Sequence, residues 1–111
     1  MPRDDTTLLD ILKAVRLAVE FKGTLDKSAF LEDLKTQSAI LHQLLLLGEA
    51  VKRLSEEFRT QYPEIAWRQV VGMRDKLIHE YDQVDLDEVW QTVSADVPRL
   101  LALLEPLAPR A

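Results

Sequence analysis

The sequence predicts an all-α protein, a small up-and-down bundle of about four to five helices. Apolar residues recur at three- and four-residue spacing along most of the chain, and no segment shows the sustained alternation of a strand. Only three Gly and five Pro interrupt 111 residues, of which 47% are hydrophobic and 30% charged, a balance typical of a folded helical globule. Because this length holds one core and no linker is visible, residues 1–111 are expected to form a single domain.

The first helix is expected to start at Asp4 or Asp5, whose carboxylates are good N-caps, and to end at Gly23. Its apolar stripe consists of Leu8, Ile11, Leu12, Val15, Ala18 and Val19. A shorter helix capped by Asp26 or Ser28 follows and runs to about residue 34. The apolar contacts expected of this shorter helix are Ala29, Phe30 and Leu34.

A long helix is predicted over about residues 36–61, and Tyr62-Pro63 stops it because a residue before proline disfavours the helical conformation. Its apolar pattern is Ile40, Leu41, Leu44, Leu47, Val51, Leu54 and Phe58. Residues 44–47 are apolar around the whole circumference, which favours a partner surface and a homodimer formed through helices. Gly48 in mid-helix costs about 1 kcal/mol against Ala, so either another helix backbone passes close by or the glycine is simply tolerated.

Two further helices complete the predicted bundle. One starts near Ala66 and Trp67 and carries Val70, Val71, Met73, Leu77 and Ile78. The other starts at Asp85, with Glu88 three residues later as in a capping box, and continues to about Leu104. Pro98 is expected to kink this last helix or to open a new turn after Asp96, and Pro106 to end it.

Charge and composition exclude several classes of function. The net charge of −5 disfavours sequence-independent nucleic-acid binding, but the charge is uneven: residues 52–79 hold 6 basic and 4 acidic side chains, net +2, whereas residues 80–111 hold 2 and 7, net −5. No Cys is present, which excludes disulfides, thiolate metal sites and a thiol nucleophile. The longest apolar stretch, residues 39–51, contains His42, Gln43 and Glu49, so a cytoplasmic protein without a membrane segment is expected.

One cluster of residues could carry chemistry. Arg74, His79 and Tyr81 place a guanidinium, an imidazole and a phenol within eight positions. The forked, permanent charge of Arg suits a phosphate, and His can move protons in either direction near neutral pH. On residue chemistry alone, such an Arg and His are more often a surface pair than an active site, and Tyr81 is more often an edge of the core. His42 lies between leucines and is interpreted as a boundary residue without a catalytic role.

Helix geometry constrains how these residues can meet. Five residues at roughly 100° each separate Arg74 and His79 by about 140°, and His79 and Tyr81 lie about 200° apart. They cannot share one face of a regular helix. Either the helix unwinds near His79 into an extended segment, or a second copy of the chain supplies the missing half of the site, and we expect both.

The pattern of Arg, four residues, His, any residue and Tyr resembles the signature of HepT-like toxins of the HEPN superfamily, with Arg74, His79 and Tyr81 matching position for position. The resemblance extends in order over most of the chain. The matching segments are Gly48-Glu49-Ala50, Arg53-Leu54, Ser55-Glu56-Glu57, Tyr62-Pro63-Glu64-Ile65, Trp67, Gly72-Met73-Arg74-Asp75, Leu77-Ile78-His79, Val84-Asp85-Leu86, Val89-Trp90 and Val97-Pro98.

The resemblance implies a HEPN-like bundle that dimerises so that two Arg-His motifs face one cleft, in which RNA is cut without a metal or other cofactor. His79 is then the general base or acid for attack of the ribose 2′-OH on the adjacent phosphate, and Arg74 stabilises the charge on the phosphoryl oxygens. Asp75 supports catalysis by orienting one of these groups, and Glu49 is a weaker supporting candidate.

The resemblance also implies a partner and a regulation. Toxins of this kind, in type VII toxin–antitoxin modules, are typically encoded beside a minimal nucleotidyltransferase antitoxin of the MntA type. That antitoxin is expected to adenylylate Tyr81. A phosphate-bearing adduct beside His79 and Arg74 would fill and neutralise the cleft, which is a physical reason for inactivation.

Some positions depart from the family pattern, and other functions stay open. Leu45 stands where the family tends to carry a charged residue, and His42 stands where Arg is common. Ala66 replaces a frequent Pro, and Glu80 replaces a frequent Gly. A carboxylate at position 80 would repel RNA if it turned inward. The acidic chain would also suit a non-catalytic helical module that binds and regulates a nucleotidyltransferase. A third possibility is a purely structural dimerisation domain.

Overall fold

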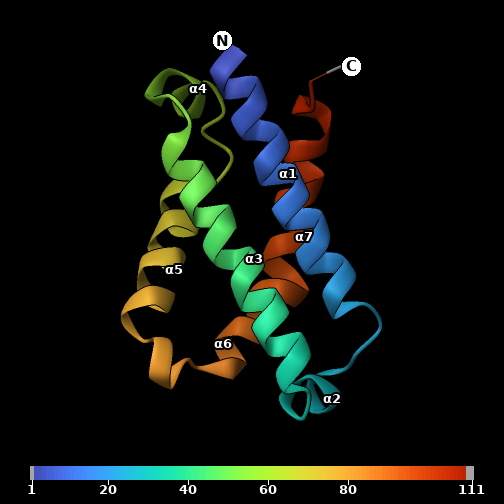
Figure 1. The fold of residues 1–111 in the computed structure, drawn as a ribbon. Coiled ribbons are helices and arrows are strands. Elements are labelled where there is room, and N and C mark those ends of the chain that lie inside the picture. Colours follow the sequence, from blue (N-terminus) through green and yellow to red (C-terminus); the bar gives the residue numbers. More distant parts are fainter. Residues whose placement is uncertain (1, 110–111) are drawn as a thin grey trace.

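The structure is a computed structural model that describes residues 2–109, apart from the side chains of Pro2 and Tyr81. All regular elements in this part of the chain are helical, so the predicted all-α class is confirmed (Figure 1). The α-helices are α1 (Pro2–Lys22), α2 (Lys27–Leu31), α3 (Leu34–Arg53), α4 (Glu56–Gln61), α5 (Trp67–His79), α6 (Leu86–Gln91) and α7 (Val97–Leu104). Shorter helical turns are Tyr81–Gln83 and Glu105–Leu107, and a π-helix spans Thr92–Asp96.

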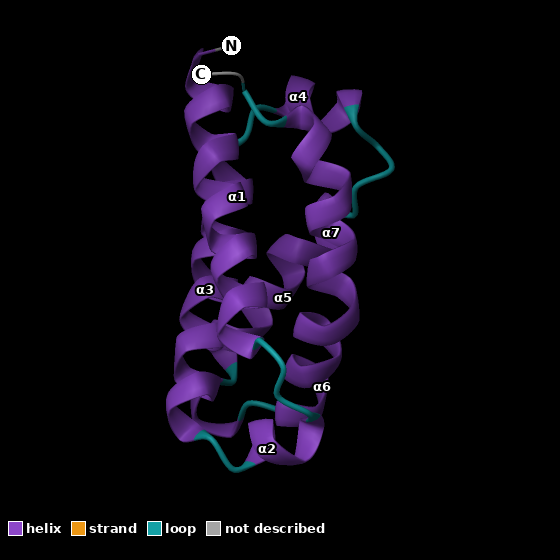
Figure 2. Ribbon diagram, turned by 90° about the vertical axis from the view of Figure 1, so that its right-hand side faces the viewer, coloured by secondary structure: helices purple, strands orange, loops and turns teal. Residues whose placement is uncertain are grey.

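The helices run up and down around one apolar core. In Figure 1, α3 lies between α1 and α5, and it packs against both of them. The view in Figure 2 shows α6 and α7 forming a column beside this layer, with α2 and α4 at opposite ends of the bundle. None of the described helices is long and apolar enough to cross a membrane. The largest fully buried side chains are Phe30, Leu8, Ile11, Leu12, Ile40, Leu44, Leu47, Leu104, Val15, Val51, Val93 and Val97.

The first helix begins before the predicted caps. Asp4 and Asp5 lie inside the first turn of α1, so they are not N-caps. Asp4 is buried and uses its carboxylate across the bundle instead, accepting hydrogen bonds from the backbone N–H of Ser55 at 2.9 Å and from the Ser55 hydroxyl at 2.7 Å. At the other end Gly23, with φ +52°, terminates α1 as predicted, because this left-handed conformation strains residues with a Cβ.

The predicted long helix over residues 36–61 is wrong at Leu54, where the backbone becomes extended and separates α3 from α4. Ser55 caps the new helix by accepting a hydrogen bond from the backbone N–H of Phe58 at 3.1 Å. The bond from Ser55 to Asp4 fixes this break to the start of α1. The apolar spacing of Leu54 and Phe58 continues across the break, which is why periodicity alone did not reveal it.

The short helix α2 is capped by Asp26, one of the two predicted caps, and it buries Phe30 completely. It ends at Leu31, however, and Asp33 caps the next helix by accepting from the backbone N–H of Thr36 at 3.0 Å. Leu34 therefore starts α3 on its outer side, where its side chain is 77% exposed. The predicted apolar contacts of Leu34 and Ala29 are wrong, since Ala29 is exposed as well.

The C-terminal part follows the predicted signals closely. Asp85 caps α6 by accepting from the backbone N–H groups of Asp87 and Glu88. The helix widens into the π-helix Thr92–Asp96 and resumes as α7 with Pro98 in its first turn. The backbone stays helical through Asp96 and Val97, so the irregularity expected at Pro98 is this widened turn and not a break. Proline lacks the N–H that would continue the regular hydrogen-bond ladder.

Candidate active site

Arg74 projects from α5 toward α3, and a glycine on α3 makes room for it. A Cβ atom added to Gly48 would lie 2.1 Å from the Cβ atom of Arg74 and 2.6 Å from its Cγ atom, distances that real Cβ atoms do not show. Of the two explanations that the sequence left open for Gly48, the close approach of another helix is therefore confirmed. This close approach sets the Arg74 side chain directly against the surface of α3.

Two carboxylates hold the Arg74 guanidinium. One Nη atom lies 2.7 Å from Glu49 on α3, and the other donates to Asp75 at 2.8 Å. The Arg74 side chain is 23% exposed, so solvent still reaches it. A guanidinium has five N–H donors, and these two contacts leave donors free for a further anion.

Lys52 extends this network on the side of Asp75. It lies one turn after Glu49 on α3, and its Nζ atom is 3.5 Å from the Asp75 carboxylate. The hydrogen bond from Arg74 lowers the pKa of Asp75 below its ordinary value, with help from Lys52. The hydrogen bond with Asp75 raises the pKa of Arg74, to which Glu49 also contributes. Each shift favours the charged form of its group, Arg74 or Asp75. We call Glu49, Lys52, Arg74 and Asp75 the charged quartet.

His79 is the last residue of α5 and is exposed to solvent. The helix ends at His79, close to the position where the sequence predicts that it unwinds. The segment that follows is not extended, because Glu80 has φ −105° and ψ 27° and residues 81–83 form a 3-10 turn. The predicted extended His-Glu-Tyr segment is thus wrong. The side chain of Tyr81 lies outside the part of the chain that the structure describes.

A single copy does not bring Arg74 and His79 onto one face. Both belong to the same regular helix, so they are separated by about 140° around its axis and about 7.5 Å along it. Neither side chain is enclosed, since Arg74 is solvent-accessible and His79 is exposed. The structure brings Arg74 together with Asp75 and Glu49, the two supporting residues named from the sequence, and adds Lys52, which sequence reasoning missed.

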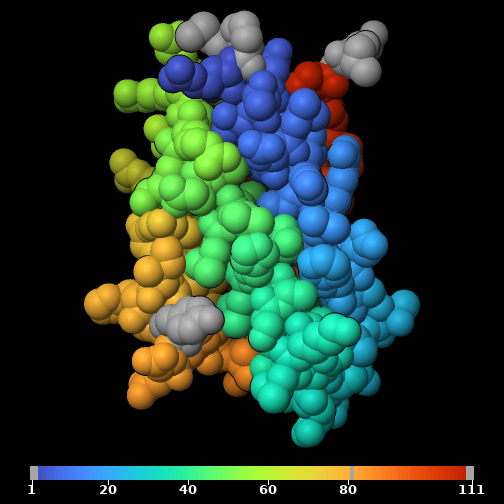
Figure 3. Space-filling view, viewed as in Figure 1, coloured from blue at the N-terminus to red at the C-terminus, as the bar shows by residue number. Residues whose placement is uncertain are grey.

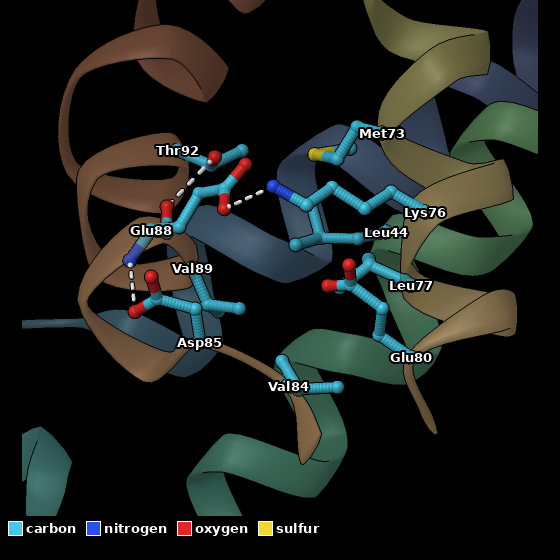
Figure 4. Close-up of a pocket in the computed structure, with 10 residues that line it drawn as sticks. All are labelled: Leu44, Met73, Lys76, Leu77, Glu80, Val84, Asp85, Glu88, Val89 and Thr92. Atoms are coloured by element: carbon cyan, nitrogen blue, oxygen red, sulfur yellow. Dashed lines mark hydrogen bonds and ion pairs between the residues drawn. The ribbon is translucent and has the colours of Figure 1, made fainter. Parts of the chain in front are cut away.

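A small pocket lies between α5 and α6 (Figure 4). Lys76 reaches across it to Glu88, with the Lys Nζ and Glu Oε2 atoms 2.7 Å apart, and Glu80 also lines it. Neither Arg74 nor His79 contributes to this pocket, so we do not place the site there. Glu80 thus faces the acidic start of α6.

Among the described residues, no group of three His, Asp or Glu side chains is placed to hold a metal ion.

Two large apolar side chains are exposed next to the charged quartet. Leu46, which is 45% exposed, lies one turn before Glu49 on α3, and Ile78, which is 48% exposed, lies one turn after Arg74 on α5. Leu44 and Leu47 are buried in the core, so of residues 44–47 only Leu46 is largely free for a partner. His42 is exposed on α3 one turn before Leu46. Figure 3 shows the molecule from the side on which α3 separates α1 from α5.

The fold and site therefore define an all-helical protein in which an Arg, held by carboxylates between two helices, precedes an exposed His on the same helix. The family model described as "Ribonuclease HepT-like" matches residues 11–107. The chain belongs to this family, as its sequence pattern predicts.

Two relatives illustrate the similarity. "Probable ribonuclease HepT" of Thermococcus cleftensis is 43% identical over 100 residues, which cover 90% of this chain and 91% of the relative. "Putative RNase MJ0127" of Methanocaldococcus jannaschii is 36% identical over 109 residues, covering 96% of this chain and 90% of the relative. Among solved structures, none matches this chain.

Proposed function

We propose that the protein is a metal-independent endoribonuclease, the toxin of a toxin–antitoxin module acting in the cytoplasm. The observation that carries this proposal is the solvent-accessible Arg74 guanidinium, fixed by Glu49 and Asp75 and followed by an exposed His79. Family membership and the names of the relatives, which describe ribonucleases, support RNA as the substrate.

The proposed reaction needs one proton acceptor, one proton donor and one charge stabiliser. His79 takes the proton of a ribose 2′-OH as its oxygen attacks the adjacent phosphorus, or it gives a proton to the departing 5′-oxygen, and water makes the other proton transfer. The bond from phosphorus to that 5′-oxygen breaks, which leaves a cyclic phosphate. The free donors of Arg74 bind the phosphoryl oxygens on which charge accumulates. Glu49 and Asp75 keep the guanidinium in place.

The separation of Arg74 and His79 on one helix favours a site shared between two copies. In a symmetric homodimer the shared cleft would hold two half-sites, each with Arg74 from one copy and His79 from its partner. Leu46 and Ile78 support this arrangement, because they expose apolar surface within one turn of Glu49 and Arg74. A second copy that covers this face would bury the apolar side chains and bring the two motifs together.

Cleavage of RNA in EDTA tests this function. The wild-type protein should degrade RNA in the presence of the chelator, and His79→Ala should abolish the activity while the helical circular dichroism spectrum is retained. Equal activity in the variant would assign the cleavage to a contaminant. A wild-type protein that leaves RNA intact would instead favour the non-catalytic binding module.

The regulation we propose is adenylylation of Tyr81 by a minimal nucleotidyltransferase of the MntA type. The phenol oxygen of Tyr81 attacks the α-phosphorus of ATP, pyrophosphate leaves, the phenol proton passes to solvent, and the tyrosine carries AMP. The position of Tyr81, two residues after the exposed His79, supports the idea that the adduct blocks the site. Intact mass after co-expression with the partner should show AMP-sized additions that are absent from Tyr81→Phe, and an unmodified wild-type chain would count against it.

A further inference from the structure

Gly72 lies in the middle of α5, and no packing contact within this copy of the chain requires a glycine there. It is exposed, and a Cβ atom added there would meet no described atom within 4 Å. In an exposed helix interior, glycine is less stabilising than alanine. Gly48 differs, since Arg74 packs against it. The missing side chain at position 72 therefore provides access to the helix backbone from outside this copy of the chain.

The residues around Gly72 form an exposed polar face. At about 100° per residue, Arg68, Asp75, Lys76 and His79 all lie within about 60° of Gly72 around the axis of α5. All four are exposed. We call these five residues the Gly72 face. It ends at His79, the proposed acid–base group.

The Gly72 face is complementary to a polyanion. Arg68 makes no hydrogen bond or ion pair with any described residue, so its charge is available. The one carboxylate on the face, Asp75, is already neutralised by Arg74 at 2.8 Å and Lys52 at 3.5 Å. Lys76 is paired in the same way, with Glu88 at 2.7 Å. The uncompensated charge of the face is therefore the positive charge of Arg68, in a chain whose net charge is −5.

We propose that the Gly72 face is the track on which the RNA backbone lies, with Arg68 binding a phosphate remote from the one that is cleaved. This inference rests on the proposed ribonuclease function. Arg68 and His79 are 11 positions apart, which corresponds to about 16 Å along the helix. This distance is longer than a single nucleotide. The absent side chain of Gly72 lets the sugar–phosphate chain pass close to the helix backbone between these two residues.

A helix from a second copy is the other occupant to consider, and the distribution of apolar side chains speaks against it. Ile78 lies about 120° from Gly72 around α5, on the side toward α3. The apolar surface suited to a subunit contact is therefore on a different side of the helix from the Gly72 face. Desolvating the unpaired Arg68 in a protein contact would cost free energy, whereas a phosphate satisfies it.

Substitutions at Gly72 and Arg68 test the track. Gly72→Ala should raise the melting temperature and Gly72→Leu should leave the protein folded, yet both should weaken binding of a labelled 2′-O-methyl RNA, which lacks the attacking hydroxyl. The larger leucine should have the stronger effect. Arg68→Gln should weaken binding and reduce the slope of log affinity against log salt concentration by about 1. The matched controls are Arg99→Gln and Ala102→Gln, at exposed positions of α7, and they should bind as the wild type does.

The outcomes separate this inference from the ribonuclease proposal. If the wild-type protein cleaves RNA in EDTA but Gly72→Leu and Arg68→Gln bind and cleave as it does, the track is wrong and the nuclease stands. If Gly72→Leu changes the mass in solution measured by light scattering, the face is a subunit contact and the inference is overturned. If the wild-type protein neither binds nor cleaves RNA, both proposals fail.

Discussion

Gly48 on α3 and Arg74 on α5 interlock so closely that a single added methyl group at position 48 would lie 2.1 Å from the Cβ atom of Arg74. This contact fixes the distance between the two helices that carry the charged quartet. It also directs the guanidinium to Glu49, the next residue on α3, at 2.7 Å. The geometry of the candidate site therefore depends on the packing of these two helices.

Gly48→Ala should destabilise the protein by about 1–3 kcal/mol, because the Arg74 Cβ atom cannot rotate away and the helices must separate. Thermal or urea unfolding followed by circular dichroism measures the change. Gly72→Ala is the matched control, and it should stabilise the same bundle by up to about 1 kcal/mol, since no described atom lies near the new methyl group. Equal effects at the two positions would show that the close approach of α3 and α5 does not contribute to the free energy of unfolding.

Arg74→Lys should lower kcat for RNA cleavage by roughly 100- to 1000-fold, although it preserves the charge. A lysine ammonium cannot reach two carboxylates and a phosphate with the fixed fork that a guanidinium presents. Steady-state kinetics with a fluorogenic RNA measures this change, with the circular dichroism spectrum as a check on folding. Activity close to wild type would mean that only positive charge matters at position 74.

Glu49→Gln should reduce kcat by roughly 10- to 100-fold with little effect on KM, because it loosens the guanidinium without removing a group that touches RNA. If Glu49 acted only through its charge, the main effect would be on KM and not on kcat. Removing a negative charge near RNA should tighten binding and lower KM. Glu57→Gln, at an exposed position of α4, is the matched control for loss of one acidic charge. The ratio of the kcat and KM effects separates the two roles.

Asp4 should make stability depend on pH. Its hydrogen bonds from the backbone and side chain of Ser55 lower its pKa below the ordinary value of 3.8. A carboxylate with a lowered folded-state pKa contributes stability that is fully present well above the unfolded-state pKa and is lost as the pH falls through the folded-state value. Asp4→Asn should therefore lower the melting temperature at pH 7 and flatten its decline below about pH 5.

Asp5→Asn provides the control for the Asp4 prediction, because Asp5 is exposed in the same turn of α1. Removal of the Asp4 carboxylate also leaves the Ser55 backbone N–H without its acceptor, which should cost about 1–3 kcal/mol. If both variants changed the pH profile equally, the effect would reflect general charge in the first turn and not the bond to Ser55.

Local signals in the sequence predicted much of the fold. The apolar spacing of the first helix, the glycine that ends it, and the caps Asp26 and Asp85 all act within one or two turns, so their effects can be recognised without tertiary structure. The break at Leu54 was missed for the opposite reason. It depends on the contact between Asp4 and Ser55, which are 51 positions apart, and the apolar spacing runs on across it.

The candidate site shows the same division between local and long-range information. Arg74, Asp75 and His79 belong to one short motif, so the sequence predicted them together. The role of Lys52 comes from the register between α3 and α5, which Gly48 sets and which no local pattern predicts. The geometry of a helix did predict that Arg74 and His79 cannot share a face, and the structure retains this separation because α5 stays helical through His79.

Complementation between two inactive variants tests the shared site most directly. Arg74→Ala and His79→Ala chains, carrying different tags and co-expressed, should form mixed dimers in which one of the two half-sites of the cleft has an intact Arg74 and an intact His79. Random pairing then gives about a quarter of the wild-type activity in the mixture, because about half of the dimers are mixed and each has one working half-site. Each variant alone should be inactive. A mixture no more active than either variant, with mixed dimers confirmed by tandem purification, would contradict a site built from two copies.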